Sequence, residues 1–103
     1  MVTRIIALFN LKPGVDRADY ERWARTVDLP TVKSLASIQD FSVHRSVALL
    51  GSDAAPPYQY VEVIDVADME QFGRDIATDV MQTVAGQFQG MADVAFILTD
   101  NLG

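Results

Sequence analysis

The order of the predicted secondary-structure elements constrains the fold of this chain more than any other feature. Alternating or continuous apolar runs predict four strands, near residues 3–12, 38–49, 58–66 and 93–99. Apolar residues at helical spacing predict two helical regions, near residues 16–35 and 68–91. The order is therefore strand, helix, strand, strand, helix, strand. Two right-handed split βαβ units of this kind give an α+β fold, a four-stranded antiparallel sheet with the helices on one face.

Two aspartates mark where the predicted helical regions begin. Asp16 and Asp68 are good N-caps, and Gln71 completes a capping box after Asp68. Pro30 is expected to break the first helical run and to start a second short helix through Leu35. With a break allowed near residues 78–79, one apolar stripe is expected along the last helical region: Met69, Phe72, Ile76, Val80, Val84 and Phe88.

The face of the sheet without helices needs a cover. With 103 residues the chain is expected to form a single domain, residues 1–103. Half of its residues are hydrophobic and its mean hydropathy is +0.14, which is rich for a small monomer. The simplest cover for an apolar sheet face is a second copy of the same sheet, so we expect a homodimer.

Charge and composition exclude several classes of function. A net charge of −6 argues against binding to nucleic acid or to an anionic membrane, because both need clustered Lys and Arg. The chain has no cysteine, which excludes disulfides and thiolate catalysis. The apolar run at residues 5–9 is too short to span a membrane and is not followed by a cleavage-site pattern. A cytoplasmic protein is therefore expected.

Sequence motifs for metals and cofactors are missing. His44 is the only histidine, so a zinc site made by the protein alone is not expected. The chain has no phosphate-binding glycine loop, no dinucleotide fingerprint and no Gly-x-Ser-x-Gly run. We therefore predict neither a metal nor an organic cofactor.

His44 and Glu62 are the candidate catalytic residues. His44 lies within the second predicted strand, and an imidazole titrates near physiological pH, as an acid–base catalyst needs. Glu62 lies in the third predicted strand and could orient His44, because the two strands are expected to be neighbours. Both residues could also belong to an interface or to the surface. Arg45 is expected to point away from the face that carries His44.

Five further residues are candidates for substrate binding. Arg4 could bind a carboxylate, and Asn10 could hydrogen-bond to a carbonyl or phenol, although Asn10 could also form the turn that follows it. Tyr20 and Trp23 lie on the apolar stripe of the first helix with Ala24 and Val27. They are expected in the core, where aromatic side chains can also line a cavity for a flat ligand. Tyr60 shares its strand face with Glu62.

Several segments resemble a known superfamily. RIIALF (residues 4–9), YVEVID (60–65) and VAFILT (94–99) make the chain similar to the dimeric α+β barrel superfamily. Within that superfamily, DLPTV (28–32), FSVHR (41–45) and PYQY (57–60) resemble the REDY-like, or HapK-like, proteins, which are associated with prodiginine-type pigment pathways. The resemblance implies a ferredoxin-like protomer, a homodimer whose sheets form a barrel, and a pocket between sheet and helices.

The resemblance leaves the activity open, because the superfamily includes cofactor-free monooxygenases, haem-degrading enzymes, polyketide cyclases and stress-induced proteins. Haem-degrading members place an axial histidine on the second helix, and residues 68–91 contain none. Cyclases of this fold use several histidines, and this chain has one. The leading hypothesis is an enzyme or accessory protein that acts on an aromatic or heteroaromatic intermediate of secondary metabolism. The alternative is a non-catalytic protein that binds a hydrophobic ligand or responds to stress.

Overall fold

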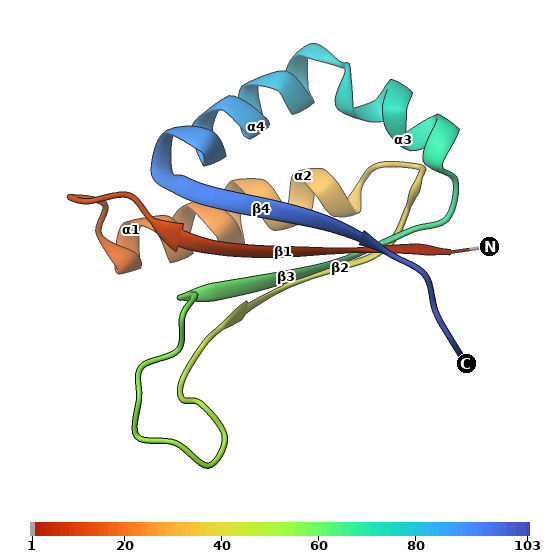
Figure 1. Cartoon of the computed structure of the whole chain (residues 1–103). Coiled ribbons are helices and arrows are strands. Elements are labelled where there is room, and N and C mark those ends of the chain that lie inside the picture. The colour runs from red at the N-terminus through yellow and green to blue at the C-terminus, as the bar shows by residue number, and fades with distance from the viewer. Residues whose placement is uncertain (1) are drawn as a thin grey trace.

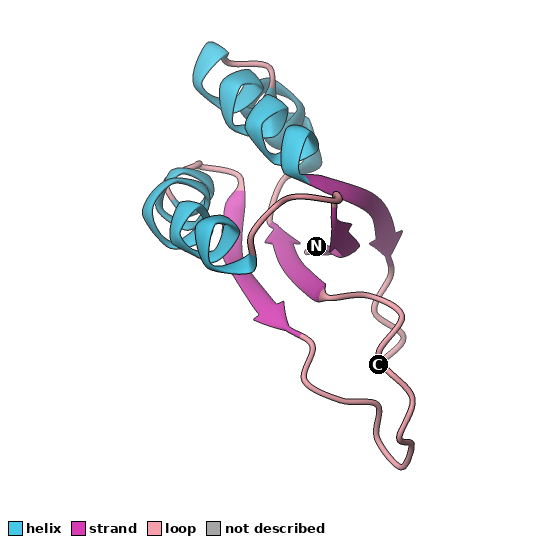
Figure 2. Cartoon of the chain, turned by 90° about the vertical axis from the view of Figure 1, so that its left-hand side faces the viewer, coloured by secondary structure: helices cyan, strands magenta, loops and turns pink. Residues whose placement is uncertain are grey.

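The structure, a computed structural model that describes residues 2–103, has the predicted βαββαβ order (Figure 1). The four strands are β1 (Thr3–Leu11), β2 (Ile38–Arg45), β3 (Tyr60–Val66) and β4 (Ala92–Thr99). They form one antiparallel sheet in the order β2-β3-β1-β4. The helices lie on one side of this sheet (Figure 2). The predicted ferredoxin-like α+β fold is therefore confirmed.

The strand register fixes which side chains face the helices. Ala7 in β1 is paired with Glu62 in β3 and with Phe96 in β4, so these three side chains point to the helix side. The neighbouring residue Ile6 is paired with Val63 and Ile97, which point to the other side of the sheet. We call this second side the bare face. Its central side chains are apolar: Ile6, Leu8, Val61, Val63 and Ile97.

The first helical region is continuous from residue 17 to residue 33. It consists of α1 (Arg17–Trp23), a π-helical turn (Ala24–Asp28) and α2 (Leu29–Lys33). The break predicted at Pro30 is wrong. Pro30 lies in the first turn of α2, so the second short helix predicted there is confirmed, although it ends at Lys33 rather than at Leu35. In the π turn the N–H of Leu29 donates to the carbonyl of Ala24, five residues back.

The predicted break in the second helical region is confirmed. It separates α3 (Met69–Ile76) from α4 (Asp79–Met91), and the Thr78 side chain caps the start of α4. The break resets the helical phase, so Met81 is buried whereas Val80 is 62% exposed. The place predicted for Val80 in the apolar stripe is therefore wrong.

Strand β2 is four residues shorter than predicted, and β3 begins two residues later. The alternating pattern continues to Leu49. However, the segment before β3 that would pair with these residues contains Pro56 and Pro57, which have no N–H to donate to a neighbouring strand. Val47 and Leu50 are consequently exposed in the loop between the strands. Alternation without a partner strand is not enough to form a sheet.

The core consists of two clusters on the helix side of the sheet. One is aliphatic apart from Phe41, and its buried members are Ile5, Val32, Phe41, Ile64, Val66 and Met81. The other is aromatic: the Phe9 ring stacks on Tyr60 at 5.3 Å and meets Tyr20 and Phe88 edge-on at 5.6 and 5.0 Å. Within residues 2–103, no helix combines the length and apolarity needed to cross a membrane.

Candidate functional site

A cavity of about 550 Å³ lies between the helix side of the sheet and the helices. We call it the main cavity. Its walls come from β1, β2, β3 and β4 below and from the π turn, α2, α3 and α4 above. Most of its lining is apolar, including Phe41, Phe72, Phe88 and Phe96. The polar side chains in the lining are Asp28, Glu62, Gln82 and Gln89.

Glu62 projects from the sheet into the main cavity. It lies in β3 between Ala7 of β1 and Val43 of β2, and only 4% of its surface is exposed. Among the described residues, its Oε1 atom has no hydrogen-bond partner. Burial, reinforced by the charge of Asp28, raises the pKa of Glu62 to about 8. Its carboxyl group is therefore mostly protonated at neutral pH and can donate a hydrogen bond or a proton.

Asp28 is the second buried carboxyl group of the main cavity. It ends the π turn, is 6% exposed, and burial raises its pKa to about 6. At neutral pH Asp28 is therefore mostly ionised while Glu62 holds its proton. Two carboxyl groups whose environments separate their pKa values can act as an acid and a base. The sequence interpretation overlooked Asp28, although it lies four residues after Ala24 and eight after Tyr20, on the stripe that faces the sheet.

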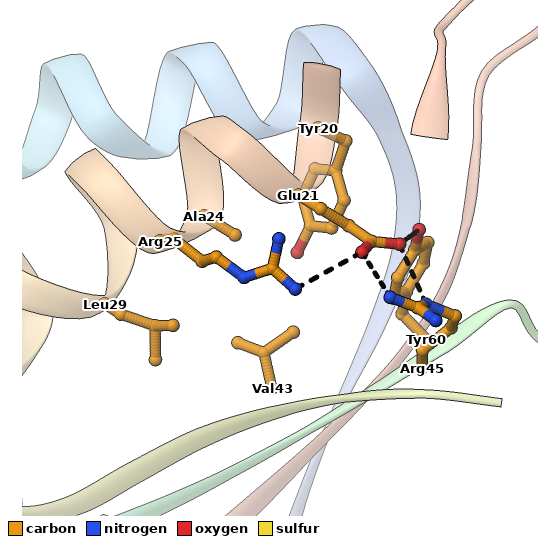
Figure 3. Close-up of a pocket in the computed structure, with 8 residues that line it drawn as sticks. All are labelled: Tyr20, Glu21, Ala24, Arg25, Leu29, Val43, Arg45 and Tyr60. Carbon is orange, nitrogen blue, oxygen red and sulfur yellow. Dashed lines mark hydrogen bonds and ion pairs between the residues drawn. The ribbon is translucent and has the colours of Figure 1, made fainter. Parts of the chain in front are cut away.

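A smaller cavity, of about 200 Å³, opens beside the first helical region (Figure 3). It is lined by Tyr20, Glu21, Ala24, Arg25, Leu29, Val43, Arg45 and Tyr60. Arg45 donates two hydrogen bonds to the Glu21 carboxylate, from Nε at 2.9 Å and from Nη2 at 2.6 Å. The Tyr60 hydroxyl donates to the same carboxylate at 2.8 Å. These hydrogen bonds hold the pKa of Glu21 below its usual value, and the contribution of Arg45 is the larger one.

Tyr20 lies in the smaller cavity's wall and is fully buried. Among residues 2–103, its hydroxyl has no hydrogen-bond partner. Burial, and then the nearby charge of Glu62, raises the pKa of this phenol far above its ordinary value, so the hydroxyl stays protonated. A buried donor without an acceptor carries a free-energy cost of about 1–3 kcal/mol. Such a group marks a place where a ligand oxygen would be stabilised.

Trp23 contributes to the wall of the aromatic cluster and does not line either cavity. Its ring stacks on Phe88 at 6.2 Å with an interplanar angle of 5°, and Phe88 lines the main cavity. Its Nε1 donates to the Gln87 side chain at 2.9 Å, which ties α1 to α4. Trp23 therefore fixes the position of a cavity wall.

The structure does not bring His44 and Glu62 together. His44 is paired with Val61 whereas Glu62 is paired with Val43, so the two side chains leave opposite faces of the sheet. The contact predicted between them is therefore not formed. The Nε2 of His44 is instead 2.9 Å from the Ser42 hydroxyl on the bare face. A catalytic role for His44 stays a prediction, and the main cavity does not include this residue.

Arg4 and Asn10 also lie on the bare-face side of β1, and each has a structural partner. Arg4 donates to both carboxylate oxygens of Asp65, at 2.8 and 3.0 Å. Asn10 donates to the Pro57 carbonyl at 3.0 Å and accepts from the Gln59 N–H at 2.9 Å, so it anchors the chain that leads into β3. Of the seven predicted site residues, Glu62 lines the main cavity, and Tyr20 and Tyr60 line the smaller one. In the part of the chain that the structure describes, no group of three or more His, Cys, Asp or Glu side chains could hold a metal ion.

Comparison with solved structures places this fold among ferredoxin-like α+β proteins. A dimeric ferredoxin-like protein of unknown function from Thermobifida fusca matches with a TM-score of 0.74 and 19% identity, over 98% of this chain and 92% of its own. SnoaB, a cofactor-independent oxygenase from Streptomyces nogalater, matches with a TM-score of 0.77 and 13% identity, over 99% of this chain and 94% of its own. At these identities the likeness shows the fold alone.

The family is identified by closer matches. The family described as REDY-like protein HapK matches residues 3–102. The crystal structure of HapK from Hahella chejuensis matches with a TM-score of 0.79 and 35% identity, over 100% of this chain and 94% of its own. This chain therefore belongs to the REDY-like HapK family. No curated protein matches it.

Proposed function

We propose that this protein binds a flat aromatic or heteroaromatic intermediate of secondary metabolism in the main cavity and moves a proton on it through Glu62. The observation that carries the proposal is a buried carboxyl group with an unpartnered oxygen in the floor of an apolar cavity. Ligand sites typically have volumes of about 300–1,000 Å³, apolar walls and a few polar groups that orient the ligand. The main cavity, at about 550 Å³, has this character.

The proposed chemistry is a proton transfer such as a tautomerisation. Glu62, protonated at neutral pH, gives its proton to one atom of the ligand and takes a proton from another. The ionised carboxylate of Asp28 stabilises positive charge that develops on the ligand while Glu62 is re-protonated. Glu62 and Asp28 are 4% and 6% exposed, and this burial strengthens both interactions because solvent screens them less.

A second candidate function is non-catalytic binding of a hydrophobic molecule. The mostly apolar lining favours it, because few polar groups are present to orient a reaction. It differs from the first candidate in one respect: the bound molecule would leave unchanged, because Glu62 would not move a proton on it.

The occupant of the main cavity can be tested with 2-naphthol, a flat apolar molecule with one hydroxyl group. We expect the wild-type protein to bind it in a calorimetric titration. Ala85→Phe places a ring in the cavity and should abolish binding. Thr83→Phe, an exposed position of α4 outside the lining, should bind like the wild type. Equal binding by all three proteins would contradict the assignment of the cavity.

Proton transfer can be followed as deuterium uptake at C1 of 2-naphthol in D₂O. The exchange proceeds through the keto tautomer and needs only a proton donor and acceptor. We expect the wild type to accelerate it and Glu62→Gln to bind the naphthol without accelerating exchange, a loss of about 10²-fold or more. His44→Ala separates the two catalytic assignments, because it abolishes exchange only if His44 is the acid or base. Binding without any accelerated exchange in the wild type would favour the non-catalytic function.

We further propose that two copies pair through their bare faces. The support is the row of apolar side chains on that face, which the helices of the same chain do not cover. Structures with this fold from Thermobifida fusca and Bacteroides fragilis are described as dimeric. In such a dimer His44 and Ser42 would lie near the subunit interface.

A further inference from the structure

The smaller cavity concentrates positive charge in an acidic protein. Arg25 and Arg45 line it, and the guanidinium of Arg17 lies over the Tyr60 ring at 5.7 Å. Glu21 is the one carboxylate in the lining. Within the lining, two positive charges against one negative charge leave a surplus of one, in a chain whose net charge is −6. The surplus favours an anionic ligand.

Glu21 does not satisfy all of these donors. Its two oxygens receive hydrogen bonds from Arg45 and Tyr60, whereas the nearest Arg25 nitrogen is 3.6 Å from Oε1, an ion pair without a hydrogen bond. A guanidinium has five N–H donors, so donors of Arg25 and Arg45 remain available. Figure 3 shows the Arg25 guanidinium extended across the cavity toward Glu21 and Arg45.

The Tyr20 hydroxyl is an independent indication of a ligand. It is fully buried and has no acceptor among the described residues, and Figure 3 shows it directed toward the Arg25 guanidinium. An anionic oxygen at this point would accept from both groups. The apolar part of the lining consists of Ala24, Leu29 and Val43.

We propose that the smaller cavity binds a small organic carboxylate, held by Arg25, Arg45 and the Tyr20 hydroxyl, with its apolar part against Leu29 and Val43. The volume of about 200 Å³ suits a molecule of a few heavy atoms. The smaller cavity shares no lining residue with the main cavity. Charge and a short apolar group together define the ligand, so inorganic phosphate fits less well. The site is independent of the function proposed for the main cavity.

The test is an NMR titration with isobutyrate at constant ionic strength. We expect saturable shifts of the backbone signals of Ala24, Leu29 and Val43 and of the Arg25 side-chain N–H. Arg25→Gln and Tyr20→Phe should each weaken binding about tenfold or more, because each removes a hydrogen bond to a charged group. Arg22→Gln, on the same helix but outside the cavity and paired with Asp19, should bind like the wild type.

Three results would overturn the proposal. They are the absence of saturable shifts around the smaller cavity, affinity unchanged in both Arg25→Gln and Tyr20→Phe, and phosphate binding as tight as that of isobutyrate. Arg25 is exposed and Tyr20→Phe keeps the ring in the aromatic cluster, so both variants are expected to fold. Their unchanged amide spectra without ligand provide the check.

Discussion

Glu62→Gln is expected to make the protein more stable than the wild type above pH 8 and to remove most of the fall in stability between pH 4.5 and 8. In the wild type, the folded protein keeps the Glu62 proton up to about pH 8, whereas the model value for an unperturbed glutamate is 4.5. The unfolded state therefore binds fewer protons in this interval, and the free energy of unfolding falls as the pH rises. The contribution is fully present below pH 4.5 and is lost as the pH passes 8.

The expected magnitude is large for a single side chain. Each unit of pKa shift corresponds to about 1.4 kcal/mol, so the full effect of Glu62 is on the order of 5 kcal/mol. Glutamine has nearly the same shape and does not ionise, so the variant avoids the cost of a buried charge. Urea unfolding of both proteins at a series of pH values measures the difference.

Asp28→Asn provides a matched control for this experiment. Because the pKa of Asp28 is raised from 3.8 to about 6, its replacement should flatten the stability profile at lower pH, between about 4 and 6. It should also shift the Glu62 transition to lower pH, because the Asp28 charge contributes to raising the pKa of Glu62. Parallel profiles for the wild type and Glu62→Gln would contradict the assignment of a buried, protonated carboxyl group.

Val63→Lys is expected to convert the proposed homodimer into monomers. Val63 lies at the centre of the bare face, paired with Ile6 on one side and with Ser42 on the other. In a two-fold dimer the substitution places two ammonium groups in one apolar interface, at a cost of about 3 kcal/mol or more. The dissociation constant should therefore rise roughly a hundredfold or more.

Sedimentation velocity at micromolar concentration measures this change directly. Thr83→Lys, which adds the same charge at an exposed position of α4, should leave the dimer intact. A wild-type protein that sediments as a stable monomer would refute the dimer. A dimer that persists in Val63→Lys would show that the copies meet through another surface.

The fold could be predicted because its signals are local. The continuous apolar run in β1, the alternation in β3, the N-caps Asp16 and Asp68, and the break before Asp79 are all properties of short segments. Errors arose where a local pattern depended on a distant partner. The residues after Arg45 alternate like a strand but form no hydrogen-bonded pairing with a neighbouring strand, because the opposing segment contains two prolines.

The site could be predicted only in part, because it depends on register. Alternation correctly separated His44 from Arg45 and grouped Glu62 with Tyr60, but it could not tell which face of β2 would match that of β3. The structure pairs Val43 with Glu62, which sends His44 to the bare face. The helical spacing places Asp28 on the stripe that faces the sheet, so this position could have been predicted. Its burial could not, because it depends on how the π turn packs over the sheet.

The carboxyl group of Glu62 can be observed directly, because the chain has only three glutamates, Glu21, Glu62 and Glu70. Carbon-13 NMR of the glutamate Cδ atoms, recorded over a range of pH on the ligand-free protein, gives the protonation midpoint of each. Burial of the Glu62 carboxyl group raises its pKa, so we expect a protonation midpoint of about 8 for Glu62. A midpoint near 4.5, the value for an unperturbed glutamate, would contradict a buried Glu62 carboxyl group that is protonated at neutral pH.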